Sequence, residues 1–416
     1  MPKKPKAGPD VTLTVQRKSL LAALTRARTV IPRSPVRPIL GGVRLSTADG
    51  LLRISATDAE IALTTTLGAD GALSPCVGSC EELTRRLKAS KAEPCVLRLR
   101  DSRLLIDSGR VRHALPTLPE QDFPPTPEPA QGGQRVLFNA RHFAQRLAVV
   151  EPAMARTATR YAITGALLES DDEGVRLVAT DGRRLVRAEL APDPLTREFK
   201  GRIILPARVV TLVQKLAARE RSALSIAIEP APPECPRFFV RGEDWQMSAL
   251  GLEGSFPAYR DVTPASRSKF LLQRLALRDA LREIALATTE SSRGVHLDLG
   301  PTDTRLSAES PELGQSTAEL PCRFLGGGDD AIRTAFNPAY LLDAIQALAG
   351  EQIVIDVDQN RLGSDGAVFS RPALLYSQGD STICWVVMPI ARDLPATRES
   401  LGSNYKEPEG SRERAA

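Results

Sequence analysis

The chain contains 416 residues, and its 42% hydrophobic and 25% charged residues are typical of a soluble globular protein. A net charge of +5 at pH 7 gives weak support for an anionic partner and fits a mixed, solvated surface equally well. No apolar run approaches the roughly 20 residues of a membrane span, and the N-terminus lacks the apolar segment of a secretory signal. We therefore expect a cytoplasmic protein with no membrane contact.

The six cysteines indicate neither a disulfide framework nor a metal centre. They are dispersed through a long chain without a secretory signal, a setting in which disulfides are rare. Cys76 and Cys80 have CxxxC spacing, but no second pair follows at the distance typical of zinc sites. We predict no metal and no cofactor.

The first part of the chain shows two helix-and-strand units after a short arm. Residues 1–10 are basic and contain proline, which predicts a disordered arm. Apolar residues at helical and alternating spacing define the elements that follow. We expect a strand over 11–15, a helix beginning near Lys18, a Pro-broken loop over 31–38, strands over 39–45 and 51–67, a helix over 80–89, and strands over 95–100, 104–107 and 111–115.

The central and last parts repeat this plan. A Pro-rich segment over 116–133 marks the first boundary, and the segment 256–264 marks the second. We expect domains over 11–128, 129–265 and 266–392, and a flexible tail over 393–416. The elements expected are strands over 136–138, 202–205, 224–228, 238–241, 246–250 and 382–388, and helices from about Arg141, from Pro206, over about 277–284 and after 337–338.

An Ala-Thr-Asp motif between apolar strands occurs twice, at Ala56–Asp58 and at Ala179–Asp181, with a fainter copy over 305–310. The copies are separated by a nearly constant, domain-sized spacing, which indicates three related domains rather than a solenoid. Asp181 and Gly182 predict a two-residue hairpin turn, because glycine accepts the positive φ that such turns need. Aspartate in a repeated turn is most simply a turn residue.

Each domain therefore contains two helices and two small sheets, which predicts an α+β protein with six helices. Acids such as Glu81, Glu82, Asp279 and Glu283 lie on these helices beside the cations, so an ordinary solvated face explains the charges unless the helices share one partner. The cations on the polar faces are Arg85 and Arg86, Arg141 and Arg146, Arg208 and Lys215, and Arg278 and Arg282.

This arrangement, and several motifs that follow one another in the expected order, resemble the bacterial sliding clamp family, the beta subunit of DNA polymerase III. The resemblance extends from about Val11 to Ile390. It implies a non-catalytic processivity factor that forms a head-to-tail homodimeric ring of clamp domains around double-stranded DNA. The motifs that carry it are Ala179-Thr180-Asp181-Gly182-Arg183-Arg184-Leu185, Phe256-Pro257-Ala258-Tyr259-Arg260 and Trp385-Val386-Val387-Met388-Pro389-Ile390, with shorter ones at 37–41, 115–119 and 160–165.

The resemblance also implies which residues contact DNA. Contacts to phosphates are independent of sequence and screened by salt, so a ring that makes them can slide. Arg33 lies next to a family contact position that is Ser34 here. Together with the helix cations, the candidates are Arg33, Arg85, Arg86, Arg160, Tyr161, Arg208, Lys215, Arg278 and Arg282.

A second implied site is a largely apolar pocket for short linear motifs of the DNA polymerase III alpha subunit, the clamp loader and repair polymerases. Such a composition is typical of a small peptide site. Carried onto this sequence, the pocket consists of Ile163, Thr180, Gly182, Arg183, Arg184, Leu185, Pro257, Val262, Val368, Ser370, Val386, Val387, Met388, Pro389 and Ile390.

Other interpretations remain open at this point. The extension after Ala391 and a less acidic composition than expected leave room for a specialised second clamp copy, such as one that protects against a clamp-binding antibiotic. A DNA-free scaffold that keeps only the peptide pocket is a further alternative. An enzyme using Asp58, Asp181 and Glu309 is disfavoured, because the sequence has no Gly-rich phosphate loop, nucleophile elbow or metal-spaced ligand cluster.

Overall fold

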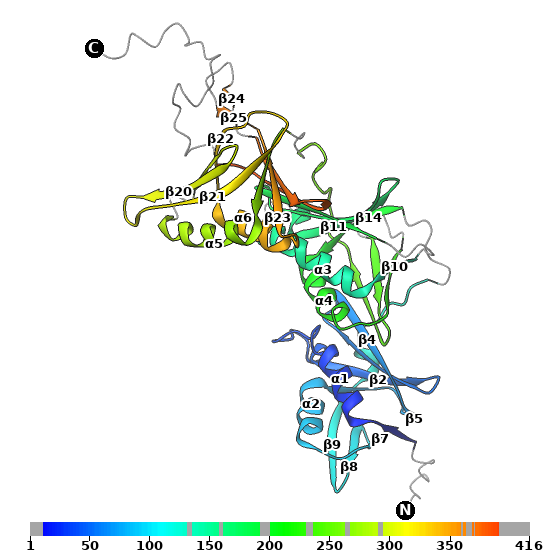
Figure 1. The fold of residues 1–416 in the computed structure, drawn as a ribbon. Coiled ribbons are helices and arrows are strands. Elements are labelled where there is room, and N and C mark those ends of the chain that lie inside the picture. Colours follow the sequence, from blue (N-terminus) through cyan, green and yellow to red (C-terminus); the bar gives the residue numbers. More distant parts are fainter. Residues whose placement is uncertain are drawn as a thin grey trace, which may run out of the picture. The chain divides into compact units, whose positions relative to one another are not determined.

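The computed structural model describes residues 11–130, 135–157, 161–191, 200–229, 236–262, 267–289, 294–358, 361–362, 368–369 and 371–390 (Figure 1). The arm and the tail expected from the sequence lie outside these ranges. None of the helices within them is long and apolar enough to cross a membrane. Contacts group the chain into two compact units, described one at a time below: Met1–Leu147, Glu169–Val175 and Ala191–Gly254 form the first, and Ala148–Leu168, Arg176–Leu190 and Ser255–Ala416 form the second.

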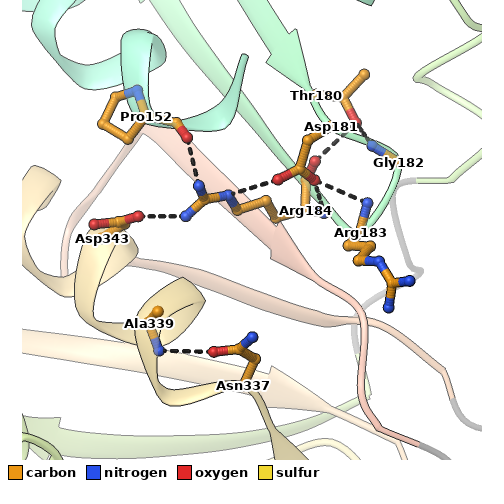
Figure 2. A network of polar contacts seen from close by, with 9 residues as sticks. All are labelled: Pro152, Thr180, Asp181, Gly182, Arg183, Arg184, Asn337, Ala339 and Asp343. Atoms are coloured by element: carbon orange, nitrogen blue, oxygen red, sulfur yellow. Dashed lines mark hydrogen bonds and ion pairs between the residues drawn. The ribbon is translucent and has the colours of Figure 1, made fainter. Parts of the chain in front are cut away.

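The six predicted α-helices are all present in the described ranges. Ser79 Oγ accepts a hydrogen bond from the backbone N–H of Glu82 and caps the second helix, and Asn337 Oδ1 caps the sixth through the N–H of Ala339 (Figure 2). The helices are α1 (Arg17–Ala27), α2 (Cys80–Ala89), α3 (Ala140–Val150), α4 (Ala207–Ala217), α5 (Arg274–Ile284) and α6 (Pro338–Ala347). Short 3-10 turns are η1 (Pro38–Gly41), η2 (Glu120–Asp122), η3 (Glu151–Ala153), η4 (Tyr161–Thr164) and η5 (Ala285–Ala287).

The first unit contains one antiparallel sheet of thirteen described strands, with α1 and α2 packed against it (Figure 1). Leu20 and Leu24 of α1 and Leu83 and Leu87 of α2 are buried in one apolar cluster with strand residues. β14 (Gly201–Pro206) precedes α4 in this unit. In sheet order, the strands are β10 (Arg135–Asn139), β15 (Ala223–Glu229), β16 (Arg237–Arg241), β17 (Trp245–Leu250), β4 (Ile61–Gly68), β3 (Leu51–Thr57), β2 (Gly42–Ala48), β6 (Cys76–Ser79), β9 (Val111–Leu118), β8 (Arg103–Ser108), β7 (Cys95–Arg100), β1 (Thr12–Val15) and β5 (Asp70–Gly71).

Strands that precede and strands that follow the Pro-rich segment 116–133 in the sequence belong to this one sheet. β17, from the central part of the sequence, pairs antiparallel with β4, with Trp245 opposite Thr65 and Met247 opposite Leu63. The side chains of Leu63 and Met247 are fully buried. Main-chain pairing and burial therefore join parts of the first two predicted domains into one compact unit.

The second unit is built around another antiparallel sheet, with α5 and α6 beside each other (Figure 1). Here β13 pairs with the last long strand, and Leu185 lies opposite Val386. A separate two-stranded ladder joins β24 (Arg361–Leu362) and β25 (Val368–Phe369). In sheet order, the main strands are β11 (Gly165–Asp171), β12 (Gly174–Thr180), β13 (Arg184–Leu190), β27 (Asp380–Val387), β26 (Ala373–Ser377), β23 (Gln352–Val357), β18 (Ser268–Gln273), β21 (Gly314–Gly326), β20 (Asp303–Ser310), β19 (Val295–Leu299) and β22 (Ile332–Phe336).

The predicted α+β class is confirmed, with local differences at three prolines. The strand predicted over 39–45 begins as η1, because Pro38 has the fixed φ that suits a helical turn. The strand predicted to end at residue 115 continues through Pro116 to Leu118. Pro206 ends β14 and precedes α4 as its cap, whereas the sequence predicted it as the first helical residue.

Candidate functional site

The turn between β12 and β13 has three residues rather than the predicted two, and side chains close it (Figure 2). Thr180 Oγ1 donates to the carbonyl of Arg184 (2.7 Å) and accepts from the N–H of Gly182 (3.1 Å). Asp181 Oδ1 accepts from the N–H groups of Arg183 (2.9 Å) and Arg184 (3.0 Å). Gly182 has a φ of 86°, which only glycine adopts without strain. These bonds hold Arg183 and Arg184 in a defined position.

The same turn occurs in the first unit between β3 and β4. Thr57 Oγ1 donates to the carbonyl of Ile61 (2.9 Å) and accepts from the N–H of Ala59 (3.0 Å). Asp58 Oδ1 accepts from the N–H of Ile61 (2.7 Å). Ala59 has a φ of 83°, at the position that glycine holds in the other turn. The two Ala-Thr-Asp motifs are therefore structural copies, and their aspartates are turn residues as predicted.

Arg184 connects its turn to two other segments of the second unit (Figure 2). Its Nε donates to Asp181 Oδ2 (3.1 Å), and its Nη1 pairs with Asp343 on α6. Its Nη2 donates to the carbonyl of Pro152 (2.5 Å), and its guanidinium lies 4.6 Å from the ring centroid of Tyr340. The side chain is only 11% exposed. Two carboxylates thus compensate a mostly buried positive charge, as burial of an ion requires.

Beside this turn lies a hollow of about 270 Å³, lined entirely by residues of the second unit. Its walls are the β12–β13 turn, the segment after Phe256 and the end of β27. Apolar side chains predominate, and the charged residues among those lining it are Arg183 and Arg184. The lining residues are Ile163, Thr180, Gly182, Arg183, Arg184, Leu185, Pro257, Ala258, Tyr259, Val262, Val386 and Met388.

Ten residues of the pocket predicted from the sequence line this hollow, within the described ranges. Among them, Val262 and Met388 are 49% and 41% exposed, so they offer apolar surface to a ligand. Leu185 and Val386 are buried and form the floor. The ten are Ile163, Thr180, Gly182, Arg183, Arg184, Leu185, Pro257, Val262, Val386 and Met388.

Val387, Pro389 and Ile390 were also predicted, but they are not among the residues that line the hollow. Successive side chains of a strand point to opposite faces, so Val387 lies on the other face from Val386, and it is fully buried. The N–H of Ile390 donates to the carbonyl of Ala335 (2.8 Å), which directs the chain away along β22. Ser370 and the side chain of Val368 lie outside the described part of the chain.

Ala258 and Tyr259 line the hollow and were missed as site residues. Both belong to the motif Phe256–Arg260 that carried the resemblance, so the signal was present in the sequence. Tyr259 is only 4% exposed, and its N–H donates to the carbonyl of Pro257 (2.7 Å). This tight turn places the ring in the wall of the hollow.

A second, larger hollow of about 970 Å³ lies in the first unit, between the end of α1, the start of α2 and β9. Arg28, Arg33 and Arg208 contribute cations to its lining. Arg33 is exposed. Arg208 pairs with Asp58 of the repeated turn, and its Nη2 donates to the carbonyl of Val30 (2.7 Å). The charge of Arg208 is therefore compensated within the chain.

The predicted cations on α2 share one acid. Arg85 Nη2 lies 2.7 Å from Glu82 Oε2, and Arg86 pairs with the same carboxylate. Hydrogen bonds from Arg86 and then Arg85 lower the pKa of Glu82. With Glu81 and Lys88 included, α2 carries three cations and two acids, which leaves a net charge of +1.

The predicted cations on α5 also share one acid. Arg278 Nη2 lies 2.7 Å from Asp279 Oδ1, and Arg282 Nη1 lies 4.0 Å from that oxygen. Lys215, at the end of α4, is exposed. Arg160 lies outside the described residues, and of Tyr161 only the backbone is described, in η4. The structure thus retains cations on α2, α4 and α5, at a lower net charge than a count of arginines indicates.

Metal-binding side chains do not gather in the described part of the chain. No cluster of three or more His, Cys, Asp or Glu side chains could hold a metal ion there. Burial raises the pKa of Cys76 to about 12, and those of Cys95 and Cys322 to about 11, so these thiols are protonated at neutral pH. The described cysteines are free and buried: Cys76, Cys80, Cys95, Cys322 and Cys384.

Comparisons with known proteins cover nearly the whole described fold. Family models of the DNA polymerase III beta subunit match at residues 11–127 (N-terminal domain), 138–258 (central domain) and 260–391 (C-terminal domain). Beta sliding clamps of Pseudomonas putida and Vibrio cholerae are 27% and 29% identical, each over 91% of this chain and 99% of the relative.

Two solved structures from Pseudomonas aeruginosa have a TM-score of 0.80 with this fold. One is a DnaN sliding clamp bound to griselimycin, 25% identical over 92% of this chain and 100% of that chain. The other is a DNA polymerase III subunit beta, 26% identical over 91% of this chain and 99% of that chain.

Proposed function

This chain belongs to the DNA polymerase III beta subunit family, and from that premise we propose that it is a DNA sliding clamp whose peptide site is the hollow beside the Arg184 turn. It is a non-catalytic processivity factor of DNA replication that acts with DNA and a polymerase as a dimeric ring. The observation that carries the proposal is the match of three consecutive family models, together with a hollow built from the residues that the resemblance selected.

The hollow is suited to the side chains of a short peptide. Its volume of about 270 Å³ lies below the roughly 300–1,000 Å³ of pockets that enclose a drug-sized ligand. Exposed Met388 and Val262 provide contact surface over a floor that contains Leu185 and Val386. We assign this site to linear motifs of the DNA polymerase III alpha subunit, the clamp loader and repair polymerases.

The expected affinity follows from the apolar surface that such a motif buries. Two or three apolar side chains contribute about 1.5–3 kcal/mol each. After the cost of ordering the peptide, binding in the roughly micromolar range results. Binding of this strength lets partners exchange at one site, which a clamp that serves several polymerases needs.

We propose that the cations that face DNA act through charge alone. Lys215 and the cation pairs around Glu82 and Asp279 retain net positive charge on three helices. Contacts of this kind are independent of base sequence and easily exchanged. Because a closed ring is held on DNA by topology, weak phosphate contacts suffice.

Retention on circular DNA tests the clamp function. The protein is loaded onto a nicked circular duplex with a clamp loader and washed with high salt, before and after the circle is cut. Retention on the intact circle and loss after cutting would demonstrate topological linkage. Loss from both would contradict the ring, and peptide binding without retention would favour the DNA-free scaffold.

A further inference from the structure

Asp58 and Arg208 form an ion pair between two distant parts of the first unit. Asp58 lies in the turn after β3, and Arg208 lies in the first turn of α4, 150 residues further along the chain. The side chain of Asp58 is only 5% exposed, whereas that of Arg208 is 47% exposed. A mostly buried carboxylate thus holds a guanidinium that is half open to solvent.

The carboxylate of Asp58 is fixed by its own turn. Its Oδ1 accepts from the N–H of Ile61 (2.7 Å), and its Oδ2 pairs with Arg208. In the copy of this turn in the second unit, Arg184 occupies the position of Ile61 and donates to Asp181 Oδ2. Because isoleucine cannot make this contact, Oδ2 of Asp58 is left for a cation from another element.

Arg208 also lines the larger hollow, together with Arg28 and Arg33. Arg28 and Arg33 are exposed, and in the described part of the chain neither guanidinium takes part in an ion pair or a hydrogen bond. Glu81 is the one acid among the described residues that line this hollow. A polyanion that reaches the hollow therefore meets two uncompensated cations and a third, Arg208, whose charge Asp58 compensates.

A DNA phosphate that binds Arg208 must compete with groups that are already in place. Asp58 pairs with Nη1, and Nη2 donates to the carbonyl of Val30 (2.7 Å). An arginine whose charge is compensated attracts a phosphate less strongly than a free one, so it displaces fewer counterions from DNA. Loss of the charge of Asp58 would leave the guanidinium on the same surface, still bonded to Val30, with its full positive charge available to DNA.

We propose that Asp58 competes with DNA phosphates for Arg208 and thereby weakens the binding of DNA to the first unit. Asp58 is a positioning residue, since it acts on DNA through Arg208. This inference rests on the proposed DNA contact of Arg208 and adds the control of that contact. Because the arginine is half exposed, the effect is moderate, about two- to fivefold in Kd at low salt.

Salt titrations of duplex binding test the proposal with the full chain. Polarisation of a labelled linear duplex measures Kd and the slope of log K against log salt between about 25 and 200 mM salt. The variants are Asp58→Asn, Arg208→Gln and the double variant. Asparagine keeps an oxygen that accepts the N–H groups of the turn, so Asp58→Asn changes the charge and leaves the turn closed.

Glu128→Gln is the matched control. It removes the acid that pairs with Arg53 of β3, so the net charge of the same unit changes by the same amount. Leu52 and Ile54, on either side of Arg53, are buried in one cluster with residues of α1 and α2, so Arg53 lies on the sheet face opposite these helices. Neither Arg53 nor Glu128 lines the larger hollow.

We expect Asp58→Asn to bind the duplex about two- to fivefold more tightly than the wild type at low salt, with a slope steeper by up to about one unit. Glu128→Gln should match the wild type. The loss caused by Arg208→Gln should be larger in the Asp58→Asn background than in the wild type, because only there is the arginine free to bind phosphate. A purely structural role of Asp58 would lower stability in urea without a steeper slope.

Unchanged or weaker duplex binding by Asp58→Asn would overturn the proposal. An equal gain in Glu128→Gln, or an equal gain from Asp58→Asn when Arg208 is glutamine, would also overturn it, since Asp58 would then act only through net charge. Should Arg208→Gln fail to fold because it leaves a buried carboxylate unpaired, the double variant compared with Asp58→Asn still measures what the released arginine contributes.

Absence of salt-dependent duplex binding by the wild type would have a different meaning. It would contradict the DNA contacts of the proposed function, and the role of Asp58 with them. Binding by the wild type that is the same in the double variant and in Asp58→Asn would instead remove Arg208 from the DNA contacts. The set of variants therefore separates an error about Asp58 from an error about DNA binding.

Discussion

Arg184 and Asp343 form an ion pair that joins the turn after β12 to helix α6. The two residues are far apart in the sequence, and one of them belongs to the motif that predicted the peptide site. The ion pair and the hydrogen bond to the carbonyl of Pro152 fix the side chain of Arg184, and the turn that carries Arg184 lines the hollow. We therefore expect peptide binding to depend on Asp343, although Asp343 does not line the hollow.

Asp343→Asn tests this support. The substitution removes one of the two carboxylates of Arg184 at a site where Asp343 is 37% exposed, so we expect about 0.5–1 kcal/mol lower stability in urea unfolding. Peptide affinity should fall as well, because the turn loses an anchor. Unchanged affinity at reduced stability would show that the pair supports the fold and not the site.

Met388→Glu should abolish peptide binding without unfolding the protein, because the side chain is 41% exposed and lines the hollow. Leu185→Glu is less informative, since Leu185 is 5% exposed and a buried charge destabilises the fold. Leu313→Glu, at an exposed turn outside the hollow, is the control. Titration with a polymerase C-terminal peptide measures the effect, and wild-type affinity of Met388→Glu would refute the pocket assignment.

Charge reversal on α4 tests the DNA contacts. Lys215→Glu should weaken association with duplex DNA and lower the slope of log K against log salt by about one unit or more. The variant Arg208→Glu should in addition destabilise the protein, because it leaves Asp58, whose side chain is 5% exposed, facing a second acid. An unaltered salt slope for Lys215→Glu would remove this residue from the DNA face.

The repeated turn predicts opposite effects of two substitutions. Gly182→Ala should lower the free energy of unfolding by about 1 kcal/mol, purely through backbone strain, since an added methyl group would meet no atom within 4 Å. Ala59→Gly should relieve the strain at a φ of 83° and stabilise the protein by up to about 1 kcal/mol. Urea unfolding measures the change in the free energy of unfolding for both variants. Changes of the same sign would contradict the strain argument.

The ion pairs of Glu82 predict a dependence of stability on acid pH. Because Arg86 and Arg85 lower the pKa of Glu82 in the folded state, its carboxylate adds stability above the unfolded pKa. That contribution is lost as the pH falls through the folded pKa. The stability difference between wild type and Glu82→Gln should therefore be present at neutral pH and vanish in acid, and a pH-independent difference would contradict this.

The sequence alone determined the local elements. Apolar spacing predicted all six helices, and the residues Ser79 and Asn337 cap two of them, because helix formation and capping depend on neighbours within a few residues. The Ala-Thr-Asp motifs and the ordered match to a known family selected most of the hollow, including Leu185 and Met388. Apolar spacing and capping are local properties of the sequence, and the family motifs are found by comparison with other sequences. Neither depends on the tertiary contacts of this chain.

Only the tertiary structure decided how distant charges and strands meet. The pairs of Arg184 with Asp343 and of Arg208 with Asp58 join residues far apart in the chain, so a count of arginines could not show which of them remain uncompensated. Strand alternation places Val386 at the hollow and Val387 on the opposite face, a distinction that requires the register of β27. Long-range pairing is determined by the packing of the whole sheet, and local sequence carries little of that information.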